Sequence, residues 1–321
     1  MTGAARPQTG APLAPLLALL AVAVLIAPVG PFPLLAVPFA LLLAAFRPKE
    51  LFGLAVAVVL MFLVFRTTDA VADGGWYMVR GWCLIAGGLF VGLSVRRSPG
   101  RLLDRSFAAV VGATVLILLA TFVSPDLGAS LDGWMAERIG EAAAMAHALL
   151  LTDPQVASGS IGDSIGTAID QWARFQRDVY PALLALATMA ALALGWYFIG
   201  RRDSVDRPPP VRDFGFRDGY VWILVAGLAL LVLPLGGGAF RVGENATLFM
   251  VLMFLARGGA VLLWILTAAT TSAWTWVLLG IGVILAYPFV FGAALLIGIG
   301  DTWLHVREKL AERAATGTGR H

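Results

Sequence analysis

The charged residue whose position most clearly indicates a functional role lies inside an apolar segment. Arg257 follows the apolar run 248–256 and precedes Gly258 and Gly259. It comes twelve residues after Asn245, which places it about 18 Å along a helix and near the middle of a membrane core about 30 Å thick. A guanidinium at that depth keeps its proton and needs a carboxylate, a carbonyl, water or an anionic ligand as its partner. The two glycines would let a ligand or another backbone approach closely.

Two interpretations of Arg257 are open. It could hold an anionic ligand, with help from Asn245 or Glu244, or it could pair with a carboxylate and lock two helices together. The candidate carboxylates are Glu244 and Asp301, and neither reaches Arg257 along its own helix. Arg80 is a further candidate ligand-binding residue, although its position beside a polar turn is more typical of a membrane-interface residue.

The usual signatures of enzymes are absent from the sequence. His147, His305 and His321 are the three histidines. Asp301 and His305 share a helix face, but a metal site needs more ligands than this pair provides. No phosphate-binding loop, zinc-protease motif or nucleophile elbow occurs. The sequence therefore predicts a protein that is not an enzyme and holds no metal and no cofactor.

The composition of the chain indicates that these residues belong to a membrane protein. Of 321 residues, 59% are hydrophobic and 13% are charged, and the mean hydropathy is +0.85. Soluble domains carry about 25% charged residues. The net charge of +3 lies mainly in Arg-rich loops between apolar segments, which is typical of membrane topology and does not indicate nucleic-acid binding. Only two of the 23 basic residues are Lys, which favours a bacterial source and the bacterial inner membrane.

About nine apolar segments predict an all-α, polytopic transmembrane bundle of eight to nine spans, because lipid leaves no partner for open backbone groups. The first run is expected to be retained rather than cleaved as a signal peptide. Pro288 is a candidate break in the last segment. The segments are Pro12–Pro28, Phe32–Phe46, Leu51–Phe65, Trp76–Val95, Phe107–Val123, Pro181–Ile199, Tyr220–Leu235, Asn245–Ala269 and Trp274–Gly300.

A long polar interval, Ser124–Val179, separates the first five segments from the rest. Its eight acidic residues and three Arg give a net charge of −5, which favours the outer face. Apolar residues recur every three to four positions over 131–150 and 161–179, so we expect an exterior amphipathic helical hairpin that caps the bundle or binds a partner. The predicted regions are a membrane bundle at 1–123, this exterior region at 124–179, a second bundle at 180–303 and a basic tail at 304–321.

Three stretches carry a family resemblance. The first is the segment from Pro181 with the Arg-rich loop that ends in Phe214-Gly215-Phe216-Arg217. The second runs from Asn245 to Arg257-Gly258, and the third is 298–309, with Gly300-Asp301-Thr302-Trp303. Together they resemble the YybS-like predicted membrane proteins of bacteria, whose function is unknown. Members tend to have Gln where this chain has Arg257, so the resemblance implies no shared role for that position.

The N-terminal half is also remotely similar to substrate-binding components of vitamin transporters and to the rod-shape protein MreD. We therefore expect a small-molecule or lipid-binding, transporter-component-like protein in the bilayer. Because no nucleotide motif is present, energy coupling would need a separate ATPase or coupling subunit. The alternative is a scaffold in cell-envelope assembly, with a partner bound through the exterior helices.

Overall fold

The computed structural model describes residues 32–66, 74–96, 102–152, 159–200, 213–269, 274, 280–283, 285–304 and 309. This described part is helical and contains no strand, which confirms the all-α class. The predicted segment Pro12–Pro28 and the histidines at 305 and 321 lie outside it. The elements are α2 (Phe32–Phe46), α3 (Leu51–Phe65), α4 (Gly74–Val95), α5 (Leu102–Val123), α6 (Pro125–Leu150), α8 (Ser160–Gly200), the 3₁₀ helix η3 (Asp218–Tyr220), α9 (Val221–Val232), α10 (Gly237–Ala269) and α12 (Tyr287–Leu304).

Five helices of the described residues are long and apolar enough to cross a membrane. They are Tyr77–Val95, Leu102–Val123, Ser160–Ile199, Gly237–Leu266 and Tyr287–Leu304. Three shorter apolar helices, Phe32–Phe46, Leu51–Phe65 and Asp218–Val232, accompany them. The membrane class is therefore supported, whereas the predicted count of eight to nine spans is not confirmed.

Several predicted boundaries differ from the observed helices. The sequence separated an amphipathic helix at 161–179 from a span at Pro181–Ile199, but α8 is one helix of 41 residues with Pro181 inside it. The predicted span start at Asn245 is also wrong, because α10 begins at Gly237. Near the candidate break at Pro288, Ala286 is a turn residue and α12 begins at Tyr287, so Pro288 lies in the first turn of α12.

The chain divides into two compact units. Unit 1 comprises Met1–Arg138 and Ala187–Pro208, and unit 2 comprises Ile139–Leu186 and Pro209–His321. In unit 1, Trp82 Nε1 donates to Thr188 Oγ1 over 2.8 Å, so α4 is joined to α8 by a buried polar contact. The Trp196 ring on α8 makes edge contacts with Phe46 and Phe90, at centroid distances of 5.3 and 6.0 Å.

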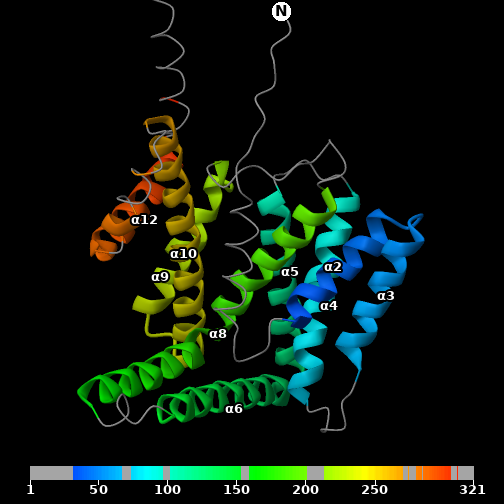
Figure 1. Cartoon of the computed structure of the whole chain (residues 1–321), viewed down its shortest axis with the longest axis horizontal. Coiled ribbons are helices and arrows are strands. Elements are labelled where there is room, and N and C mark those ends of the chain that lie inside the picture. Colours follow the sequence, from blue (N-terminus) through cyan, green and yellow to red (C-terminus); the bar gives the residue numbers. More distant parts are fainter. Residues whose placement is uncertain are drawn as a thin grey trace, which may run out of the picture. The chain divides into compact units, whose positions relative to one another are not determined.

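In unit 2, α10 packs against both α9 and α12 (Figure 1). Close approach depends on glycines: a Cβ on Gly243 would lie 2.8 Å from the carbonyl oxygen of Gly227 in α9. Likewise, a Cβ on Gly258 would overlap the carbonyl oxygen of Ala294 in α12, and one on Gly298 would overlap that of Phe254. These contacts place α9 along the N-terminal half of α10 and α12 along its C-terminal half, both antiparallel to α10.

The polar interval forms the helices α6 and the first part of α8. Within unit 2, His147 on α6 and Asp170 on α8 are joined by a 2.9 Å contact between Nε2 and Oδ1. The amphipathic pattern is confirmed as helical, and it buries Ile139 and Val179. Several apolar side chains of the same pattern stay exposed in this chain: Met145, Leu149, Ile161, Ile165, Trp172 and Phe175.

Candidate binding site around Arg257

Arg257 and Asp301 meet because α10 and α12 are antiparallel. Side chains on a helix lean toward its N-terminus, so these two, from facing helices that run in opposite directions, converge. Arg257 Nε donates to Asp301 Oδ2 over 3.0 Å, and the two side chains are 6% and 3% exposed. This is the carboxylate pairing that the sequence left open as an alternative, and Asp301 is one of the two partners it named.

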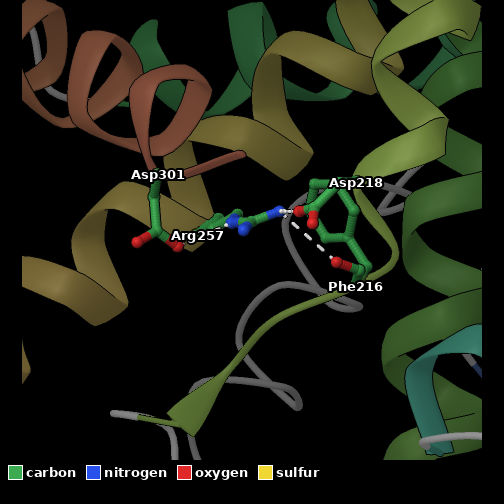
Figure 2. Close-up of polar contacts among 4 residues, drawn as sticks. All are labelled: Phe216, Asp218, Arg257 and Asp301. Atoms are coloured by element: carbon green, nitrogen blue, oxygen red, sulfur yellow. Dashed lines mark hydrogen bonds and ion pairs between the residues drawn. The ribbon is translucent and has the colours of Figure 1, made fainter. Parts of the chain in front are cut away.

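A second set of contacts comes from the segment that leads into α9. Arg257 Nη1 donates to Asp218 Oδ1 over 2.8 Å and to the carbonyl oxygen of Phe216 over 3.3 Å. Figure 2 shows the guanidinium between Asp301 on one side and Asp218 with Phe216 on the other. The Phe216 ring also lies under the guanidinium, 5.3 Å from ring centroid to Cζ, and stacks on Tyr220. Arg257 is thus anchored by three elements of unit 2.

The two carboxylates differ in their access to solvent. The Asp301 side chain is 3% exposed, whereas that of Asp218 is 44% exposed. Two carboxylates and one guanidinium carry a formal charge of −1. One carboxylate is enough to neutralise Arg257, so the second is in excess. Breaking the Asp301 contact would leave a charge buried without a partner, but Asp218 can return to water at little electrostatic penalty. Asp218 is therefore the more solvent-accessible of the two carboxylate partners of Arg257.

Hydrogen-bonding capacity remains at this cluster. A guanidinium has five N–H donors, and among the described residues the hydrogen bonds of Arg257 use Nε and Nη1 but not Nη2. Thr302, beside Asp301 on α12, is 4% exposed, and its Oγ1 has no partner in that same part of the chain. An anionic oxygen of a ligand could accept a hydrogen bond from Nη2.

The other predicted site residues do not join Arg257. Glu244 lies thirteen residues before it on α10, a rise of about 20 Å, and Asn245 binds α8 instead. Arg80 belongs to unit 1, where its Nε donates to the carbonyl oxygen of Val64 over 2.7 Å. Sequence reasoning missed Asp218 and Phe216 as neighbours of Arg257.

Asn245 stabilises α8 beside its internal proline. A proline removes one helical hydrogen bond and disturbs the preceding turn. The Asn245 carboxamide bonds both backbone groups next to Pro181: Oδ1 accepts from Ala182 N–H over 3.0 Å, and Nδ2 donates to the carbonyl oxygen of Asp178 over 3.1 Å. In a regular helix these two groups would bond to each other. Asn245 therefore joins α10 to α8 and has a structural role in this arrangement.

We expect Asn245→Leu to lower the free energy of unfolding by about 1–2 kcal/mol, because it leaves the two backbone groups without side-chain partners. The measurement is unfolding of the purified protein in mild detergent. In a Pro181→Ala background, where the helix can pair its own backbone, the same substitution is expected to have a smaller effect. Equal effects in both backgrounds would contradict this role.

The pattern of a protein family described as "Predicted membrane protein (DUF2232)" matches residues 15–302. The chain belongs to this family. No curated protein and no solved structure matches it. The matched range of this DUF2232 protein includes Arg257, Asp218 and Asp301, so the whole cluster lies within the family domain.

Proposed function

We propose that this DUF2232 protein is a non-enzymatic, multi-pass protein of the bacterial inner membrane that binds a small molecule or lipid through an anionic group at Arg257. The observation that carries the proposal is the unequal pairing of Arg257, with a buried carboxylate on one side and a half-exposed one on the other. In this proposal, Asp301 holds the guanidinium in place, and a ligand carboxylate or phosphate replaces Asp218.

Two further features support binding at this point. The short helix α9 begins beside Arg257 rather than at an end of α10, since η3 supplies Asp218. Helix N-termini favour anions, and interrupted helices that end beside a longer one are a common form of binding site in transporters. The remote similarity of the N-terminal half to substrate-binding components of vitamin transporters is in line with such a role. A separate ATPase or coupling subunit would then supply the energy.

The test compares ligand retention among matched variants. Protein is purified in mild detergent, and the anionic metabolites and lipids that co-purify are quantified by mass spectrometry. Arg257→Lys is expected to lower the amount of bound anion at least tenfold, because a single ammonium does not reproduce the guanidinium contacts. Asp218→Asn is expected to raise it, because the competing carboxylate is neutralised. Asp213→Asn, an exposed change in the same segment, is the control for Asp218→Asn.

Either of two results would overturn the proposal. Retention that is unchanged in Arg257→Lys would exclude Arg257 as the anion site. Loss of the anion in Asp218→Asn would show that Asp218 does not compete with it. Intact folding of each variant is checked by its elution volume and by its unfolding transition.

A second candidate is a scaffold in cell-envelope assembly, favoured by the exposed apolar residues of α6 and α8. Trp172 and Phe175, which are in ring contact with each other, are 47% and 39% exposed. We expect the double change of Trp172 and Phe175 to Ser to remove an envelope partner from the purified complex if this candidate is correct. Retention of that partner would exclude the α8 surface, and the control is the same change at Trp222, which is 69% exposed on α9.

A further inference from the structure

A second buried cation lies in unit 1, apart from the site proposed above. Arg105, in the first turn of α5, is 9% exposed. Its guanidinium lies over the Trp196 ring, 5.1 Å from Cζ to the centroid. Its Nε is buried and has no hydrogen-bond partner in the described part of the chain. A buried donor of a charged group without an acceptor is unfavourable by about 1–3 kcal/mol or more, so this position favours a bound acceptor.

A buried hydroxyl without a partner lies at the same end of the α4–α5 hairpin as Arg105. Ser94 on α4 is 4% exposed, and no hydrogen bond of its Oγ is found among the described residues. The register of the α4–α5 hairpin follows from Gly112, whose Cβ would lie 3.1 Å from Leu89. Gly112 and Leu89 are therefore level with each other. Five residues nearer the connecting loop on each helix, Ser94 is level with Phe107, which is within one turn of Arg105. Ser94 also lies one turn after Phe90, which contacts the same Trp196 ring.

The charge at this position favours an anion. Asp104, the preceding residue, is also buried and has an interaction of its own, and its carboxylate does not accept a hydrogen bond from Arg105 Nε. Arg96 lies at the same end of the α4–α5 hairpin and is exposed. Arg47, at the end of α2, donates to the carbonyl oxygen of Ile199 and pairs with Glu50. A guanidinium and a hydroxyl together match the oxygens of a phosphate group.

The depth of the cluster indicates the source of the phosphate. Arg105 is in the first turn of the membrane-spanning helix Leu102–Val123, and Ser94 is in the last turn of the span Tyr77–Val95. Span ends lie at the depth of lipid headgroups. The rings of Phe46 and Phe90 pack on Trp196, so the Arg105 guanidinium lies against an apolar aromatic cluster. We propose that Arg105 and Ser94 bind the phosphate of an anionic phospholipid beside Trp196.

The test is native mass spectrometry of delipidated full-length protein in detergent. The probes are phosphatidylglycerol, phosphatidylcholine and inorganic phosphate, titrated separately. The expected result is saturable binding of phosphatidylglycerol that Arg105→Gln weakens at least tenfold and Ser94→Ala weakens severalfold. Arg96→Gln is the matched control: it removes a positive charge at the same end, and its effect should be smaller and should vanish at high salt, because exposed charges are screened.

Three results would overturn the inference. The first is equal phosphatidylglycerol binding by wild type, Arg105→Gln and Ser94→Ala. The second is equal weakening by Arg105→Gln and Arg96→Gln at high salt, which would indicate non-specific attraction. The third is saturable inorganic phosphate binding that competes with the lipid, which would assign the site to a free anion. The titrations are repeated in an Arg257→Lys background, where the phosphatidylglycerol site that depends on Arg105 should persist, so this inference and the proposed function fail separately.

Discussion

Asp301→Leu is expected to lower the free energy of unfolding by about 3–5 kcal/mol, because it leaves the guanidinium of Arg257 buried without its principal partner. Leu has nearly the same shape as Asp, so little packing volume is lost. Asp218 still contacts Nη1, but it is half-exposed and cannot replace a fully buried carboxylate. The measurement is equilibrium unfolding of purified protein in mixed detergent micelles.

A double-mutant cycle separates the ion pair from simple packing. Arg257→Met alone leaves Asp301 as the uncompensated charge, so it should also destabilise the protein by several kcal/mol. The double variant, with Arg257→Met and Asp301→Leu, is expected to recover most of the lost stability, since an apolar pair of similar volume replaces a buried ion pair with little penalty. Asp218→Asn is the control and should change the stability by about 1 kcal/mol or less. Additive effects of the two single variants would contradict a direct ion pair.

The position of Arg257 could be predicted from sequence, but its surroundings could not. An arginine within an apolar run requires a partner, and that requirement made Asp301 a candidate. The choice between Asp301 and Glu244 depends on how α10 and α12 face each other, which is a property of packing and not of spacing along one helix. Asp218 was missed because its segment looked like part of a solvated basic loop.

Helix positions were predicted well where apolar runs end at strong polar signals. The segments Phe32–Phe46 and Leu51–Phe65 coincide with α2 and α3. Predictions failed where a polar stretch continues a helix, as in α8 and in the start of α10. Proline and asparagine usually indicate helix ends. Here, however, Asn245 hydrogen-bonds the α8 backbone next to Pro181, and such a long-range pairing cannot be recognised from either segment alone.

Gly258→Ala is expected to lower the free energy of unfolding by about 3 kcal/mol, the upper part of the range for overpacking. The added Cβ would overlap the carbonyl oxygen of Ala294 and would lie 2.9 Å from the backbone nitrogen of Gly298. Backbone atoms cannot rotate away as a side chain can, so α10 and α12 would have to separate. Separation would also lengthen the contact between Arg257 and Asp301, and the loss of stability should therefore be accompanied by weaker anion retention at Arg257.

The neighbouring glycine supplies a matched control. Gly259 is exposed, and a Cβ added there would meet nothing within 4 Å. Because Ala is a better helix former than Gly, Gly259→Ala should leave the stability unchanged or raise it by up to about 1 kcal/mol. Both variants add one methyl group to adjacent positions of the same helix, so a difference between them reports the α10–α12 contact alone. Equal behaviour of the two variants would show that Gly258 does not pack against α12, and the pairing of Arg257 with Asp301 would then lose the close approach on which it depends.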